Sequence, residues 1–287
     1  GIKKGMNKGM FSNVDLSVGT HDRYAEKLMG AYFNDKYRVM VFGNANNTND
    51  MGFPGGGGGG RWGASKQGLN ASKMLGANFN YDDGKKLKLD GSVRWNHSDG
   101  DVRSKNSTEN FVSSMGSYSN RLSQNYTRSN SWDARMRLEW TPDSMTDIMF
   151  RPKFSYSTTD GNNTDNSASY KDDPFLYVTD PLSEAAIEKL AADSMMVNTV
   201  RNTNISYGKS KSVSAMLQYN RKLNSKGRNF TLRADVDYDD NDNKSLSTSN
   251  VHLYQVRNAL GADSTYQINR YNVTPTKSWD YSVMTTY

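Results

Sequence analysis

Two adjacent segments carry the clearest alternation of apolar and polar residues in the chain. From Trp132 to Trp140 the even positions are Trp, Ala, Met, Leu and Trp, whereas the odd positions are Asp, Arg, Arg and Glu. Because successive side chains of a strand point to opposite faces, this segment predicts a strand with one apolar and one charged face. The alternation restarts after Pro142-Asp143-Ser144 and continues to Tyr156. The two segments therefore predict a β-hairpin.

The spacing of the two tryptophans points to a membrane. Eight residues span roughly 27 Å along a strand, or about 21 Å along the axis of a barrel whose strands tilt by ~40°. Outer-membrane barrels have an apolar band of ~25 Å bounded by aromatic girdles. Phe230 and Tyr238 repeat the spacing. A strand of a soluble sandwich alternates too, so the repetition of the pattern along the chain is what favours a barrel.

The alternation recurs in eight further segments, which gives about ten strands. They are Met10–Val18, Tyr24–Phe33, Tyr37–Phe42, Leu69–Tyr81, Leu87–Trp95, Val213–Tyr219, Phe230–Tyr238 and Trp279–Tyr287. In the second of these we expect Ala25, Met29, Ala31 and Phe33 to form the more apolar face. Pro152, on the apolar face of the hairpin, cannot donate a ladder hydrogen bond, so we expect a bulge or a local break there.

Short and long connections alternate along the chain. Compact turns lie near residues 34, 83, 143 and 225, and long polar stretches cover 44–68, 97–131, 157–209 and 239–277. Outer-membrane barrels have short periplasmic turns and long extracellular loops, so the long stretches are predicted to be extracellular. One of them contains a short predicted helix, Leu182–Ala192, with Asp180 as its cap and Pro181 at its first position.

The composition narrows the class of protein. The chain has 287 residues, no cysteine, 35% hydrophobic residues and a formal net charge of +6. No apolar run approaches the ~20 residues of a spanning helix. The absence of cysteine excludes a disulfide scaffold and a thiolate metal site. Basic residues are interspersed with acids, so nucleic acid is not an expected partner.

Two sets of residues resemble sites but are better explained otherwise. Gly55–Gly60 is followed by Arg61, without the Lys-Ser/Thr pair of a phosphate-binding loop, so a flexible extracellular loop is expected. The three histidines, His21, His97 and His252, have no metal-ligand spacing and are expected in surface loops near strand ends.

Four oxygen-bearing side chains at alternate positions resemble the first half of a calcium loop. They are Asp237, Asp239, Asn241 and Asn243. Position six of such a loop would be Asp242 instead of Gly, and position twelve would be Thr248 instead of Glu, so a polar strand end is favoured. No nucleophile-elbow motif is present. We therefore assign no catalytic, cofactor-binding or metal-binding residue, expect no cofactor, and do not expect an enzyme.

The charged faces of the predicted strands leave two interpretations open. Their residues are Lys88, Asp90, Arg94, Arg135, Arg137, Glu139, Arg151, Lys153, Arg233 and Asp235. They form either a polar wall along a substrate path or cross-strand ion pairs that hold the sheet together. Aromatic residues of the long stretches are candidates for stacking on a ligand: Trp62, Phe111, Tyr118, Phe175 and Tyr177. The sequence selects no substrate-binding residue among them.

Several segments carry a family resemblance. They are Gly43–Pro54, the glycine run with Arg61-Trp62-Gly63, Arg137–Thr146, Phe150–Tyr156 and Thr276–Ser282. With these segments the chain resembles the TonB-dependent receptor-like outer-membrane β-barrel proteins of Bacteroidetes. The resemblance implies an all-β, transmembrane, antiparallel up-and-down β-barrel of about 22 strands, of which this chain supplies about the first ten, with one short helix in an extracellular loop.

The resemblance also implies a domain organisation and partners. Residues 1–9 are expected to be the exit segment from a missing plug domain, and residues 10–287 a partial outer-membrane barrel domain. The expected location is the cell outer membrane, with membrane lipid as the surrounding medium. The plug and a TonB-type energy-coupling protein would act through missing segments, and a surface lipoprotein is a further candidate partner.

The function that the resemblance implies is a TonB-dependent receptor or transporter for nutrient import, with its substrate unassigned. An alternative is a non-transporting outer-membrane barrel that presents surface loops for glycan or protein binding; it would lack a plug and a TonB-contacting segment. A third hypothesis is a soluble secreted β-sandwich lectin, which cell fractionation would distinguish from both.

Overall fold

A computed structural model describes residues 8–48, 69–111, 118–224 and 227–287. Ten strands form one antiparallel sheet in which every strand pairs with its neighbours in sequence. The strands are β1 Gly9–Val18, β2 Tyr24–Phe33, β3 Tyr37–Asn46, β4 Leu69–Asp82, β5 Leu87–Glu109, β6 Tyr118–Asp143, β7 Thr146–Tyr170, β8 Met196–Lys222, β9 Asn229–Arg257 and β10 Asp263–Thr286. The predicted all-β class and the up-and-down order are confirmed.

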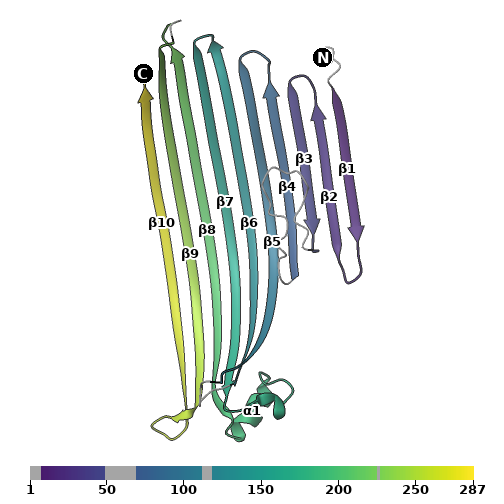
Figure 1. The fold of residues 1–287 in the computed structure, drawn as a ribbon, viewed down its shortest axis with the longest axis vertical. Helices are drawn as coiled ribbons and strands as arrows, with labels where there is room; N and C mark the ends of the chain where they lie inside the picture. The colour runs from purple at the N-terminus through teal and green to yellow at the C-terminus, as the bar shows by residue number, and fades with distance from the viewer. Residues whose placement is uncertain (1–7, 49–68, 112–117, 225–226) are drawn as a thin grey trace.

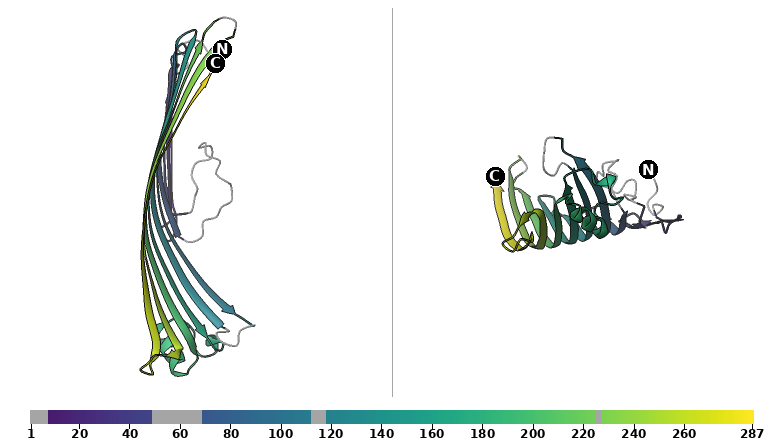
Figure 2. Two further views of the ribbon diagram at one scale, coloured as in Figure 1. Left: turned by 90° about the vertical axis from the view of Figure 1, so that its left-hand side faces the viewer. Right: turned by 90° about the horizontal axis from the view of Figure 1, so that it is seen from below.

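The sheet is twisted and curved, with β1 at one edge and β10 at the other (Figures 1 and 2). Within the described residues these two strands do not pair with each other. The compact turns between β2 and β3, β4 and β5, β6 and β7, and β8 and β9 lie at one end of the sheet, and α1 lies at the other (Figure 1). We call these the turn end and the far end.

The turn between β4 and β5 is fixed by its own side chains. The Oδ1 atom of Asp83 accepts hydrogen bonds from the backbone N–H groups of Lys85 and Lys86 at 2.8 Å each and from that of Leu87 at 3.0 Å. Gly84 has a φ of 72°, a conformation that glycine adopts without steric cost. This local chemistry is why the Asp-Asp-Gly-Lys sequence predicts the turn correctly.

The strands at the far end are much longer than predicted. The polar stretches 97–131, 157–209 and 239–277, predicted as long loops, belong mostly to β5–β10, which run for 23 to 29 residues each. Between β9 and β10 the connection is only 258–262. Of the predicted loop 44–68, residues 44–46 are in β3, and residues 49–68, with the glycine run and Trp62, lie outside the described residues.

The missed strand extensions have a physical explanation. Polar residues occupy both faces there, so hydropathy does not alternate, although the backbone ladder continues unchanged. Hydroxyl groups also pair across strands: Ser98 and Ser129 share a hydrogen bond of 2.7 Å, and Ser104 and Ser123 share one of 2.6 Å. Such pairs contribute to sheet stability without leaving an apolar signal in the sequence.

The register corrects the predicted face of β2. Val14 of β1 pairs with Leu28, and Met10 pairs with Tyr32, so Leu28 and Tyr32 share the apolar face of β1. The predicted set of Ala25, Met29, Ala31 and Phe33 lies on the opposite face. The prediction was wrong because β2 carries apolar residues on both faces and Glu26 interrupts the correct one.

Pro152 causes a local break without a bulge. The ladder between β6 and β7 lacks the pairs opposite Met136 and Arg137 and resumes in the same register at Leu138 and Phe150. On its other side Pro152 pairs with Ala215 of β8 in an unshifted register. The register shift between β6 and β7 instead lies between Trp140 and Asp143, next to the turn.

The connection between β7 and β8 contains a 3-10 turn, η1 Pro174–Leu176, and one helix, α1 Glu184–Ala192. The helix starts two residues later than predicted, because its cap is Ser183, whose Oγ accepts a hydrogen bond from the N–H of Ala186 at 3.3 Å. The predicted cap Asp180 instead forms an ion pair with Lys105 at 2.9 Å. No helix among the described residues is long and apolar enough to cross a membrane.

A small apolar core holds α1 against the far end of the sheet. Leu190 of α1 packs with Ala168, Tyr170 and Met196, all of which are almost fully buried. The Tyr170 hydroxyl donates a hydrogen bond of 2.9 Å to the carbonyl of Pro181, and burial raises the pKa of Tyr170 to about 12. Among the described residues only the connection between β7 and β8 packs on the sheet, so this core is their main buried apolar cluster.

We expect Leu190→Ala to destabilise the docking of α1 by about 2–3 kcal/mol, because the change removes a buried side chain from a small core. Hydrogen exchange should then increase at residues 184–192 while the sheet stays protected. The control is Leu176→Ala, which truncates a side chain of the same connection that is 72% exposed. Equal exchange in the two variants would contradict this account of the core.

Candidate membrane-facing surface and ligand pocket

One face of the sheet carries a continuous apolar surface, which we call the apolar face. Trp132, Met136 and Trp140 of β6 lie on it, and the register joins them to apolar residues of the neighbouring strands: Trp95 pairs with Trp132, and Leu87 pairs with Trp140. Both tryptophans of β6 are nearly half exposed. The opposite face, which bears Arg135 and Arg137, is called the polar face below.

Aromatic side chains border the apolar face in two rows. The far row consists of Tyr24, Trp95, Trp132, Tyr156, Tyr238 and Trp279. The turn-side row consists of Tyr32, Tyr37, Tyr81, Trp140, Tyr219 and Phe230. Several members touch across strands: the ring centroids of Trp95 and Trp132 are 6.1 Å apart, those of Tyr238 and Trp279 4.4 Å.

The two rows run parallel to each other and obliquely to the strands. In β2, β6 and β9 the aromatic residues of the two rows are eight positions apart, as in Tyr24 and Tyr32. Directly opposite residues can be traced from strand to strand between β2 and β9. Relative to this line of paired residues, each row shifts by about six residues toward the turn end. That stagger over seven strand steps corresponds to strands tilted by roughly 30° from the normal to the rows.

The surface between the rows contains no charged side chain on β5–β9. On β6 it is formed by Ala134, Met136 and Leu138, and on β9 by Leu232, Ala234 and Val236. Val236, Leu217 and Phe154 are exposed although they are apolar. A contiguous exposed apolar surface of this kind is a mark of contact with lipid or another protein.

The polar face brings opposite charges together in the same band. In the register, Lys88 lies opposite Glu139 and Asp90 lies opposite Arg137. The close contacts also run along single strands: Arg137 pairs with Glu139, and Arg233 Nε donates to Asp235 Oδ2 at 2.8 Å. The predicted ion pairing is therefore partly cross-strand, as in Lys88–Asp82 at 3.8 Å, and partly between positions two apart.

Three predicted basic side chains at the centre of the polar face form no ion pair in the described part of the chain. Arg135, Arg151 and Lys153 lie on β6 and β7, with Arg135 directly opposite Lys153. Arg135 donates a hydrogen bond of 2.9 Å to Ser92, an uncharged partner. Two predicted charges of β5 also lack an ion pair: Arg94 lies over the ring of Phe42 at 5.7 Å, and Asp90 accepts a hydrogen bond from the side-chain amide of Asn80. The middle of the polar face thus bears an excess of positive charge.

The acidic segment of β9 does not form a calcium loop. Asp237, Asp239, Asn241 and Asn243 lie within one continuous strand on the polar face. Alternate residues of a strand are ~6.8 Å apart, whereas calcium ligands must converge on one point. No group of three or more metal-ligating side chains occurs among the described residues.

Two of the histidines lie in strands and not in loops as predicted. His97 is in β5 and His252 in β9, while His21 is in the turn after β1. Of the predicted loop aromatics, Phe111 is almost fully exposed, and Tyr118 begins β6 and donates a hydrogen bond of 2.8 Å to Glu109. Phe175 and Tyr177 lie in and beside η1. Among the described residues no ring contact joins Phe111, Tyr118, Phe175 and Tyr177 to one another.

A polar cluster on the apolar face lies directly beyond the far row. His97 Nε2 is 2.9 Å from Asp99 Oδ2, and its Nδ1 is 2.7 Å from Asn130 Oδ1. Arg128 Nε donates to Asp99 Oδ1 at 2.7 Å. Burial acts to raise the pKa of Asp99, but hydrogen bonds from Arg128, His97 and Tyr126 outweigh it and lower the pKa below its usual value. The change from Trp95 to this cluster marks the edge of the apolar band.

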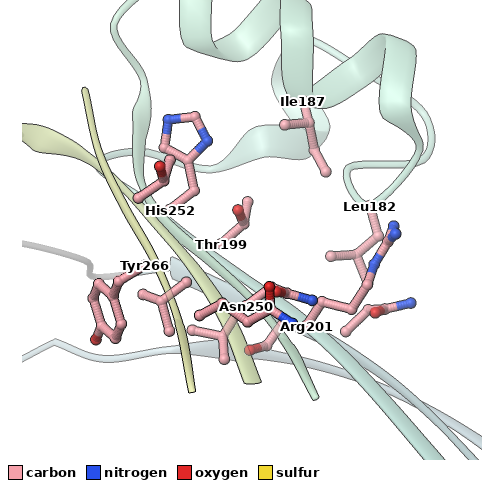
Figure 3. Close-up of a pocket in the computed structure, with 13 residues that line it drawn as sticks. Leu182, Ile187, Thr199, Arg201, Asn250, His252 and Tyr266 are labelled. Atoms are coloured by element: carbon pink, nitrogen blue, oxygen red, sulfur yellow. The ribbon is translucent and has the colours of Figure 1, made fainter. Parts of the chain in front are cut away.

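A cavity of about 590 Å³ lies between α1 and the far ends of β7–β10. Leu182 and Ile187 from the helical connection face Arg201 of β8 and Asn250 and His252 of β9 (Figure 3). Sequence reasoning missed this cavity, because only the register shows that residues so far apart in the chain share one face. The apolar residues of the predicted helix were its one sequence signal.

A second cavity of about 590 Å³ lies at the turn end of β1–β5. It is lined by Phe11, Phe33 and Met40 on the polar face, with Arg38 and Asp90 nearby. The apolar residues on both faces of β2 and β3 are the signal that indicates it. It gives the first strands an apolar patch on a face that is otherwise polar.

Comparisons with known proteins give no assignment. No family model matches the chain, and no curated protein sequence matches it significantly. Among solved structures it is similar to the ferric yersiniabactin uptake receptor FyuA of Yersinia pestis, with 11% identity and a TM-score of 0.25, covering 97% of this chain and 44% of the receptor. A BenF-like porin of Pseudomonas fluorescens Pf-5 aligns at 9% identity and a TM-score of 0.12, covering 96% and 95% of the two chains. At such scores neither similarity bears on what this chain does.

The Asp99 cluster predicts a pH dependence. Because the folded pKa of Asp99 is lowered, its contribution to stability is present above the unfolded pKa of ~3.9 and is lost as the pH falls through the folded pKa. The pair with Arg128 is half exposed, so the contribution is about 1 kcal/mol or less. Asp99→Asn should therefore lower the unfolding free energy more at pH 7 than at pH ~3. Equal effects of Asp99→Asn at both pH values would contradict a stabilising role for the ionised Asp99 carboxylate.

Proposed function

We propose that this chain forms part of an outer-membrane β-barrel. The observation that carries the proposal is the apolar band of constant width between two parallel aromatic rows. Eight residues tilted by roughly 30° span about 23 Å, close to the ~25 Å band of transmembrane barrels. If both rows lie parallel to the membrane plane, the strands are tilted by roughly 30° from the membrane normal, which is close to the ~35–45° of such barrels. A soluble sandwich has no reason to keep two rows parallel across eight strands.

The proposal requires the barrel to be closed. Unpaired strand edges in lipid leave backbone N–H and C=O groups without partners, at a cost of several kcal/mol for each group. We propose that residues 10–287 supply about ten strands of a larger barrel, and that residues 1–9 connect them to a preceding plug domain. The apolar patch around Phe33 on the polar face of the first strands supports a covering domain on that side.

We further propose that the barrel serves as a receptor or transporter for nutrient import, with a TonB-type protein as its energy-coupling partner. Support comes from the polar face, whose middle carries Arg135, Arg151 and Lys153 without ion-pair partners in the described residues. Such a wall suits a water-filled path or a plug with acidic groups. The substrate is left unassigned.

A non-transporting barrel that displays a binding surface is the second candidate. The cavity beside α1 favours it, because it lies far beyond the band and away from the polar face. Genetic removal of the TonB-type protein separates the two functions. For a transporter it should abolish uptake as fully as removal of this protein does, whereas a display barrel should keep its binding in that background.

Single cysteines test the membrane assignment cleanly, because the chain contains no native cysteine. In whole outer membranes, Ser155→Cys on the polar face should react with a water-soluble maleimide, and Phe154→Cys on the apolar face should stay protected until the membrane is dissolved in detergent. A cysteine in lipid is inaccessible to the reagent and poorly ionised. Rapid labelling of both variants before detergent is added would refute the proposed orientation of the two faces.

A buried charge gives a second test. Met136 lies midway between the aromatic rows, so Met136→Arg should cost roughly 2–4 kcal/mol of stability in phospholipid vesicles. Leu122→Arg is the matched control, since Leu122 is on the same strand and face, and both side chains are 38% exposed. It lies beyond the far row and should cost less than ~0.5 kcal/mol. Similar unfolding free energies of the two variants would be incompatible with a lipid-facing band.

A further inference from the structure

We propose that the cavity beneath α1 binds a small monocarboxylate that also carries a hydrogen-bond donor and an apolar body, as an apolar amino acid does. The cavity lies on the apolar side of the sheet, about 12 residues along β9 beyond Tyr238 of the far row, and is therefore well outside the band. Its volume of about 590 Å³ is in the ordinary range for small-molecule sites.

Hydrogen-bonding side chains form one row across the floor of the cavity. Asn166 pairs with Arg201, Arg201 with Asn250, and Asn250 with Gln267, so the four side chains come side by side from β7 to β10. All four line the cavity. The row places a guanidinium group between two amides, an arrangement that suits a planar anion.

Arg201 is the unneutralised charge of this site. In the described part of the chain it has no ion-pair or hydrogen-bond partner, whereas Arg257 at the same end of the sheet pairs with Asp263 at 2.7 Å. The other cationic candidate, His252, faces the same Asp263 at 3.2 Å and is stacked on Tyr254 with centroids 3.9 Å apart. One unpaired guanidinium matches one negative charge, which favours a carboxylate over a phosphate.

Two further features define the rest of the ligand. The Oδ1 atom of Asn166 is buried and has no hydrogen-bond partner, so a rotation of this amide toward the cavity would let a donor on the ligand satisfy it. On the opposite side, Ile187 projects from α1 toward the strands, and Arg201 extends toward Leu182 (Figure 3). The side chains of Leu182 and Ile187 form an apolar wall for the body of the ligand. A carboxylate, a donor and an apolar group are thus each matched by a different part of the cavity.

Calorimetric titration of the detergent-solubilised protein tests this assignment with three related probes. L-phenylalanine has all three features, L-phenylalaninamide lacks the carboxylate, and 3-phenylpropionate lacks the amine. We expect saturable binding of L-phenylalanine, binding at least tenfold weaker for the amide, and binding about three- to tenfold weaker for 3-phenylpropionate. Absence of saturable L-phenylalanine binding at millimolar concentrations, or equal affinity of all three probes, would overturn the proposal.

Variants locate the site. Arg201→Gln should weaken L-phenylalanine binding at least tenfold, whereas Arg270→Gln should change it by less than twofold. Arg270 is the matched control, because it is an exposed arginine at the same end of the sheet but on the opposite face. Ile187→Ala, which leaves the charges intact, should weaken binding about threefold. Equal binding by the two arginine variants would overturn the site, whatever the outcome of the cysteine labelling, since the cavity lies outside the band.

Discussion

The continuous antiparallel ladder is the constraint on which every other feature of this structure depends. A strand pair holds its register by backbone hydrogen bonds, and a shift of one residue would exchange the two faces. From β2 to β9 the register is kept across the whole apolar band, interrupted at Pro152 without a shift. Ten strands can therefore present one apolar face and one charged face although, among the described residues, only the connection that contains α1 packs on the sheet.

The same ladder explains how the molecule divides along its length. Inside the band, apolar side chains on one face and charges on the other match two different surroundings. Beyond the far row both faces become polar, which fits strands that continue into water, and the hydroxyl pairs such as Ser98–Ser129 hold neighbouring strands together. At the far end α1 adds a second layer, and there Leu190 and Tyr170 form a core beside a cavity.

Much of the band could be predicted from residues alone, and most of the candidate site could not. Trp132 and Trp140 identified the strand, its faces and its spacing, because alternation is a local property. The prediction failed for β2, where both faces are apolar, and for the extensions of β5–β10, where neither is. Both failures have one cause: hydropathy reports what surrounds a side chain and carries no information about pairing when the two faces have similar surroundings.

The all-β class, the order of the strands, the compact turns and the two-faced hairpin could all be read from the amino-acid sequence, because each follows from neighbouring residues. The folded sheet was needed to reveal the parallel course of the aromatic rows, because that course depends on the register of eight strands. The folded structure was also needed to show that Arg201, Asn250 and Ile187 line one cavity, since strand pairing and the packing of Leu190 bring them together from distant parts of the chain. The hairpin from Trp132 to Tyr156 is the local unit, and the ladder turns ten such strands into one surface.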